Sequence, residues 1–444
     1  MGRLLRPALL GASALMLAGA MTLTAAVALG GAPDRTGDGT LTTSGAAGGT
    51  GRPGPAGSPT SSVAALQQRL RDVPDDHRGW ATLSLGYVEQ ARVTADPTFY
   101  AKADAALTRA ARLAPGDSVV LTARATLAAA RHQFHRALSA ADRAIDVNPY
   151  SAQAWAVRSD ALTELGRYRA AHAAAVRADD LEPGPPTFAR LSYQAELRGD
   201  LAEATRLMRL SRDAATANAP AYAFASFHLG ELARASGDLR GAGRHYAAAL
   251  SADPTYAPAL AGRARLAAAR GDYAASVRSY RSVVARLPLP EYVAELADLY
   301  LATGRPGQAE QQLAVAAASA RLAAANGVRT DLETALVEAD HGSSADALRA
   351  ARAEWSVRRT IHTADAMAWA LHAVGRDRTA LAYARQATAL GTQDARLLFH
   401  RGAVEAALGL DGPARDHLRA ALRIDAGVAP LREQQARHLL EGLS

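Results

Sequence analysis

The chain has no cysteine, a single lysine at Lys102, and few aromatic residues, which make up 5% of it. The lack of cysteine excludes a disulfide framework, thiol chemistry and a lipid anchor attached to cysteine. Nearly all basic residues are arginines, and they alternate with Asp and Glu as on solvated helix faces. No basic run with interleaved aromatic residues accompanies the net charge of +7, so the composition does not predict a nucleic-acid partner.

Sequence motifs of catalysis are missing as well. The chain has no glycine-rich phosphate loop and no helix with two histidines around a glutamate. The motif of a nucleophile elbow is also absent. We therefore expect a chain that is not an enzyme, with no catalytic residue, no metal and no cofactor.

A period near 34 residues runs through most of the chain. Pro115, Pro149 and Pro183 stand 34 residues apart, and each follows an alanine by five positions. Pieces that begin with glycine recur at spacings of 33, 38 and 34 residues, at Gly166, Gly199, Gly237 and Gly271. Such a period predicts an array of one supersecondary unit, and arrays of this kind usually bind partners.

The best copy of the repeat predicts two helices, over residues 154–165 and 168–181. Gly166 lies between them, where the end of a helix favours a left-handed residue. Ala171, Ala175 and Ala178 line one side of the second helix, and their small size lets two helices approach closely. Pro183 ends that helix because it lacks an N–H group.

The repeat resembles the tetratricopeptide repeat. The first-helix pattern of that family is matched by Trp80, Leu83 and Tyr87, by Trp155, and by Leu229-Gly230. The second-helix pattern is matched by Ala103, Leu107, Ala110 and Pro115, by Ala242, Tyr246, Ala249 and Pro254, and, with Ser for Ala, by Ser276, Tyr280, Val283 and Pro288. The resemblance implies an all-α fold, an α-solenoid superhelix of about ten helix-turn-helix units within residues 62–444. We expect longer second helices in the fourth and seventh units.

The end of such an array needs a helix with a polar outer face, because the last unit otherwise exposes an apolar surface. Pro430 suits the first turn of a helix, where its missing N–H group is not needed. We therefore expect a capping helix over residues 429–443. Its inner residues would be Leu431, Leu439 and Leu440, and its outer residues Arg432, Glu433, Gln435, Arg437 and Glu441.

The N-terminal sequence is typical of an exported protein. Arg3 and Arg6 precede an uncharged stretch over residues 7–33 that is rich in Ala, Leu and Gly. Residues 1–29 therefore read as a cleaved signal peptide or as a membrane anchor with a tether over residues 8–29, and both readings stay open. Residues 30–61 are rich in Gly, Ser, Thr and Pro and predict a disordered linker. Either reading puts the array outside the cytoplasm, secreted or anchored to the cell membrane.

By register with the repeat, one side of the first helices forms a concave groove. A wall of charged and aromatic side chains there suits an extended peptide or a partner helix. His362 and His372 would lie about 15 Å apart along one helix, which is too far for a single metal ion. The expected groove residues are Asp160, Tyr193, Phe227, Glu231, Arg234, Arg265, Asp298, His362, Asp365, Trp369, His372 and Phe399.

Together these patterns predict a noncatalytic scaffold at the cell envelope that binds a partner protein or peptide in its groove. Two alternatives remain. A peptide-sensing regulatory protein would need a defined pocket rather than an open groove, and an enzyme would need a site that the motifs above do not reveal.

Overall fold

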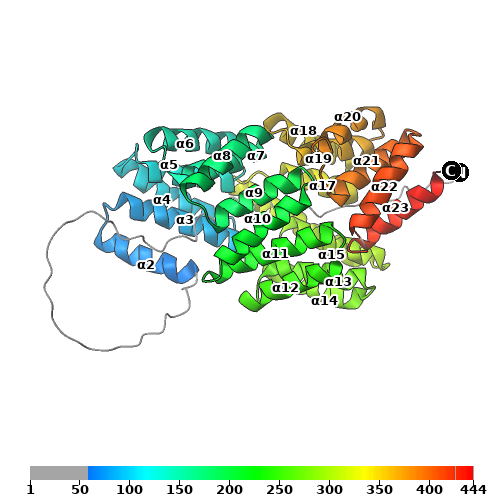
Figure 1. Cartoon of the computed structure of the whole chain (residues 1–444), viewed down its shortest axis with the longest axis horizontal. Coiled ribbons are helices and arrows are strands. Elements are labelled where there is room, and N and C mark those ends of the chain that lie inside the picture. Colours follow the sequence, from blue (N-terminus) through cyan, green and yellow to red (C-terminus); the bar gives the residue numbers. More distant parts are fainter. Residues whose placement is uncertain (1–58, 426, 444) are drawn as a thin grey trace.

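The computed structural model describes residues 59–425 and 427–443, and the regular structure in these ranges is entirely helical (Figure 1). Ten helical hairpins follow one another, so the expected all-α solenoid is confirmed. The hairpins are α3 (His77–Thr94) with α4 (Phe99–Leu113), α5 (Ser118–Ala130) with α6 (Phe134–Val147), α7 (Ala152–Glu164) with α8 (Tyr168–Leu181), α9 (Pro185–Leu197) with α10 (Leu201–Ala214), α11 (Ala219–Ala235) with α12 (Leu239–Ala252), α13 (Ala257–Ala269) with α14 (Tyr273–Arg286), α15 (Pro290–Ala302) with α16 (Pro306–Ala325), α17 (Asp331–His341) with α18 (Ser344–Val357), α19 (Ile361–Ala373) with α20 (Asp377–Ala387), and α21 (Ala395–Ala407) with α22 (Asp411–Asp425). Helix α2 (Pro59–Asp72) precedes them and α23 (Pro430–Gly442) follows them.

The recurring Gly-Asp piece forms the turn inside a hairpin. Gly199 has a φ of 74° and ends the first helix of its unit in the left-handed region, as expected. Asp200 then caps the second helix, because its carboxylate accepts a hydrogen bond from the backbone N–H of Glu203 at 3.0 Å. Two adjacent residues thus stop one helix and start the next.

Alanines let the two helices of a unit and their neighbours pack closely. Ala171, Ala175 and Ala178 are all 0% exposed on α8, which has the predicted bounds. Pro183 follows the end of this helix by two residues. The seventh unit has the expected long second helix, α16, with 20 residues. The expectation for the fourth unit is wrong, because α10 has 14 residues and the extra length lies in the loop before α11 and in α11 itself, which has 17.

The array curls so that its last part lies beside the helices in its middle, such as α15 (Figure 1). We call α3–α16 the first arc and α17–α22 the second arc. The hairpin turns of the first arc meet the loops between units of the second arc, and we call this contact the seam. It joins residues 131–133 to 327–329, 166–168 to 359–361, and 198–199 to 391, so about 195 residues separate the partners each time.

Backbone meets backbone at two turns of the seam. A Cβ atom added to Gly166 would lie 2.2 Å from the carbonyl oxygen of Arg359, and one added to Gly199 would lie 2.1 Å from that of Gly391. No side chain fits at either position. Tyr168 strengthens the contact, because its hydroxyl accepts a hydrogen bond from the backbone N–H of Ile361 at 2.9 Å.

A buried cation also crosses the seam. Arg358 of the second arc pairs with Glu164 of the first arc and with Glu354 on α18. All three side chains are at least 90% buried. Because a charge without a partner in such surroundings is costly, each of these groups depends on the others.

The expected capping helix is present as α23, which begins with Pro430 in its first turn. It packs on α21 and α22, and also on α15 of the first arc, so it joins the two arcs as well as covering the end. One residue differs from expectation. Arg432 is 3% exposed rather than on the outer surface, because it pairs with the buried Asp425.

The signal or anchor expected over residues 1–29, with its tether over 8–29, lies outside the described residues. The same holds for the expected linker over 30–61, except that α2 already begins at Pro59. None of the helices in residues 59–425 and 427–443 combines the length and the apolar character needed to cross a bilayer.

The seam predicts different costs for the same substitution at two hairpin turns. Gly271 has a φ of 78° but nothing within 4 Å of an added Cβ. Gly271→Ala should therefore cost only the strain of the left-handed backbone, about 1–2 kcal/mol. Gly199→Ala adds a collision with the backbone of Gly391 and should cost clearly more in urea unfolding. Equal losses for the two variants would contradict the seam.

The buried cation gives a second prediction. Arg358→Leu leaves Glu164 and Glu354 buried without their partner and should cost about 3–5 kcal/mol of unfolding free energy. Adding Glu164→Gln and Glu354→Gln should restore part of this loss, since neutral amides tolerate burial better. Arg206→Leu, which removes an exposed ion pair on α10, should change the urea midpoint little.

Candidate functional site

The twelve residues expected in the groove all lie on first helices of hairpins, but most of them contact other parts of the chain. Four lie at a cavity between the arcs, and the others hold helices together. Seven of the twelve are less than 9% exposed: Asp160, Tyr193, Phe227, Arg265, Asp365, Trp369 and Phe399.

Two of these residues form buried ion pairs between neighbouring units. Asp160 accepts two hydrogen bonds from Arg190, at 2.8 and 2.9 Å. Arg265 lies between Glu295 at 2.8 Å and Glu231 at 3.2 Å. Their charges are thus balanced within the array, and in this conformation neither side chain presents a surface to a partner.

The face of α19 that carries His362, Asp365, Trp369 and His372 is divided among different contacts. Asp365 accepts a hydrogen bond from His400 at 2.8 Å and lies 3.3 Å from Arg396. Trp369 donates to Asp340, and His372 contacts Asp377, both at 2.5 Å. In the part of the chain that the structure describes, no three His, Asp or Glu side chains converge to hold a metal ion.

The remaining expected residues pack or pair in the same way. Asp298 lies 3.1 Å from His341, which is almost fully buried. Phe227 lies among the rings of His228, Tyr246 and Tyr256. Phe399 packs on Trp369 in the core between α19 and α21.

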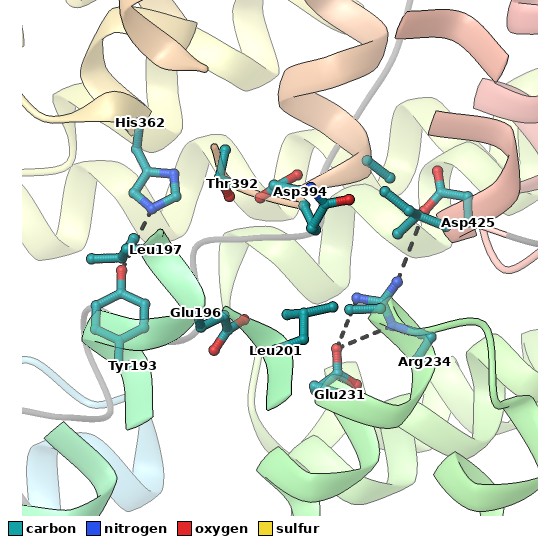
Figure 2. A pocket seen from close by; sticks show the side chains of 14 residues that line it. Tyr193, Glu196, Leu197, Leu201, Glu231, Arg234, His362, Thr392, Asp394 and Asp425 are labelled. Carbon is teal, nitrogen blue, oxygen red and sulfur yellow. Dashed lines mark hydrogen bonds and ion pairs between the residues drawn. The ribbon is translucent and has the colours of Figure 1, made fainter. Parts of the chain in front are cut away.

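A cavity opens between the two arcs, beside the seam at Gly199. Figure 2 shows Tyr193, Glu196, Glu231 and Arg234 on the helices of the first arc, facing His362 and Asp394 across the cavity. The space open to the centre of a water molecule is about 70 Å³, enough for several waters or one small group. Its other lining residues are Leu197, Leu201, Ala235, Thr392, Gln393, Ala395, Ile424 and Asp425.

Glu231 and Arg234 form the balanced side of this cavity. Glu231 lies 3.1 Å from Arg234 and 3.2 Å from Arg265, and it accepts a hydrogen bond from the hydroxyl of Tyr246. Burial alone would raise the pKa of Glu231, but the two arginines outweigh burial and lower its pKa to about 2. This carboxylate is therefore ionised at any physiological pH.

Glu196 is the unbalanced group of the cavity. Among the described residues its carboxyl group has no ion pair and no hydrogen bond to a side chain, although it lies on the cavity wall. Burial, together with the nearby charges of Glu231 and Asp394, raises the pKa of Glu196 to about 8. At neutral pH the group is thus mostly protonated, and a nearby cation would favour its ionised form.

Several other polar groups of the wall have hydrogen-bonding capacity to spare. His362 lies 3.5 Å from the hydroxyl of Tyr193, and its Nδ1 atom has no partner. Burial and the charge of Arg396 lower the pKa of His362 to about 4, so the ring is neutral near pH 7. Asp425 is 3% exposed, and its Oδ1 atom has no hydrogen bond. The Nη1 atom of Arg234 lies 3.9 Å from this oxygen, which is too far for a hydrogen bond.

The sequence indicated four residues of this cavity, Tyr193, Glu231, Arg234 and His362, but missed Glu196, Thr392, Asp394 and Asp425. Glu196 follows Tyr193 by three positions on α9, so helix periodicity could have found it. The other three come from the second arc and reach the cavity only because the array curls. No local pattern carries that information.

The raised pKa of Glu196 predicts how stability depends on pH. The contribution of Glu196 to the free energy of unfolding is fully present below the pKa of this residue in the unfolded chain, near 4.5. It is lost as the pH rises toward 8, because burial opposes ionisation of the carboxyl group. Glu196→Gln should therefore melt at a higher temperature than the wild type at pH 9, and the gain should vanish near pH 4.5. Calorimetry between pH 4.5 and pH 9 measures this difference in melting temperature, and the exposed Glu203→Gln serves as the control. A gain that is independent of pH would contradict the assignment.

No family model and no curated protein sequence matches the chain. Solved structures with similar helical arrays include a hetero-tetramer of Cut9 and Hcn1, with 14% identity over 87% of this chain and 93% of the other and a TM-score of 0.38. A human IFIT1 dimer with m7Gppp-AAAA matches with 13% identity over 82% of this chain and 86% of the other, at a TM-score of 0.45. PilW, a type IV pilus biogenesis factor, matches with 17% identity over 44% of this chain and 90% of its own, and the TM-score is 0.38. These likenesses concern the repeat architecture and carry nothing about ligands.

Proposed function

We propose that the chain is a noncatalytic scaffold that binds a partner protein or peptide. The observation that carries this proposal is the cavity between the arcs, whose wall holds the carboxyl group of Glu196 without an ion-pair partner among the described residues. Repeat arrays use such surfaces for binding, because their helices are rigidly held by neighbouring units. Within the expected groove set, the partner would contact the residues at the cavity, Tyr193, Glu231, Arg234 and His362.

In this proposal, the remaining groove residues stabilise the array and do not contact the partner. Asp160, Arg265 and Asp365 each pair with a charged residue of a neighbouring unit and hold the first helices in place. A partner would reach them only in a more open conformation of the array.

A peptide-sensing role is the second candidate function. Such a protein needs a defined pocket, and the cavity is bounded by both arcs rather than by one open surface. A ligand held there would contact the first and second arcs at once and would stabilise the curled form by linkage.

We further propose that the array acts outside the cytoplasm. The support is the sequence of residues 1–33, in which Arg3 and Arg6 precede a long uncharged stretch. Cleavage and retention of that segment both fit this location.

One experiment tests both partner binding and location. The chain has no cysteine, so Gln393→Cys at the exposed rim of the cavity gives a unique thiol. A membrane-impermeant maleimide that carries a photo-crosslinker should label it in spheroplasts and then crosslink one protein. The matched control is Leu210→Cys on the exposed surface of α10, which should be labelled but not crosslinked to that protein.

The possible failures are distinct. Labelling only after lysis would contradict the location. If Gln393→Cys is labelled but crosslinks no protein, the proposed scaffold function is wrong. If Gln393→Cys and Leu210→Cys crosslink the same protein, the partner does not bind specifically at the cavity.

A further inference from the structure

The cavity between the arcs has more acceptors than donors. Four carboxyl groups line it, against one guanidinium group, that of Arg234. Arg234 and Arg265 balance Glu231, and Arg432 balances Asp425. The remaining carboxyl groups are those of Glu196 and Asp394.

Asp394 already has a structural role. It caps α21 by accepting hydrogen bonds from the backbone N–H groups of Arg396 at 2.8 Å and Leu397 at 3.4 Å. Glu196 has no comparable partner among the described residues, so the wall contains one acidic group whose counter-charge the array does not supply.

A second observation concerns hydrogen bonds rather than net charge. Thr392 is 7% exposed and lines the cavity, yet its hydroxyl has no hydrogen-bond partner among the described residues. The Oδ1 atom of Asp425 also has no hydrogen bond. Buried polar atoms normally find partners, so the Oδ1 atom of Asp425 indicates a missing donor in the cavity, and the hydroxyl of Thr392 is free to accept from the same donor.

The size of the cavity limits what can supply that donor. The space open to the centre of a water molecule, about 70 Å³, suits the end of one side chain rather than a peptide backbone with its side chains. A guanidinium group is flat, carries five donors in a fixed fork, and is less strongly hydrated than an ammonium group. It therefore matches a wall of carboxylate and hydroxyl oxygens better than an ammonium group does.

We propose that the cavity receives one arginine side chain of the partner polypeptide, whose guanidinium group pairs with Glu196 and donates to Thr392. This inference rests on the proposed scaffold function and specifies its ligand. The arginine would contact both arcs.

The probe for this site is N-acetyl-arginine amide, which has the side chain but no charged termini. In calorimetric titration of the full chain at pH 9 it should bind, whereas N-acetyl-citrulline amide, of similar shape but without charge, should not. Glu196→Gln should weaken binding at least tenfold, and Glu203→Gln, on the exposed surface of α10, should leave it unchanged.

Dependence on pH is a separate readout. Because the pKa of Glu196 is about 8, binding should be about 100-fold weaker at pH 6 than at pH 9 and should release a proton at pH 7. Glu231, with a pKa of about 2, and His362, with one of about 4, keep their charge states across this range. The other ionisable groups that face Glu196 are Tyr193, Arg234, Asp394 and Asp425.

Several results would overturn the proposal. Equal binding of the citrulline probe, or an unchanged affinity of Glu196→Gln, would show that the cavity holds only waters or a neutral group. Absence of arginine binding while Gln393→Cys still crosslinks a protein would refute this inference alone. Arginine binding without any crosslinked protein would instead identify a small cationic ligand and refute the partner.

Discussion

The second arc can lie on the first only because backbone meets backbone at the hairpin turns. At Gly166 and Gly199 the space for a Cβ atom is filled by a carbonyl oxygen of the other arc. The same glycines are needed inside their own units, where the chain turns in the left-handed region. One residue type thus satisfies a local and a distant constraint, and the curl of the whole array depends on this coincidence.

The curl decides how the charged inner faces are used. In an open solenoid, the ion pairs of Asp160, Glu231 and Arg265 would border a wide groove. Here Arg190, Arg234 and Glu295, all in the first arc, balance their charges, and the second arc closes over the cavity beside Glu231. The proposed site lies where the two arcs meet around Glu196, a carboxyl group that has no such partner within residues 59–425 and 427–443.

Much of the fold could be predicted because its causes are local. The period, the turn at Gly166, the buried alanines of α8 and the helix that begins at Pro430 all follow from residues that are near in sequence. The curl could not be predicted, because it accumulates from small rotations between units and is fixed by contacts about 195 residues apart. For the same reason the sequence indicated Tyr193 and His362 at the cavity but not Thr392 or Asp425, and it put Arg432 on the outside.

The distance in sequence across the seam also sets an order of events during synthesis. Arg358 is 194 positions after Glu164, and at about 5–20 residues per second its synthesis follows about 10–40 s later. Throughout that time Glu164 lacks its cation, and the turn at Gly166 lacks the backbone that later covers it. The nascent chain therefore passes through a half-built stage in which its edge is open to chaperones, or to another copy of the second arc.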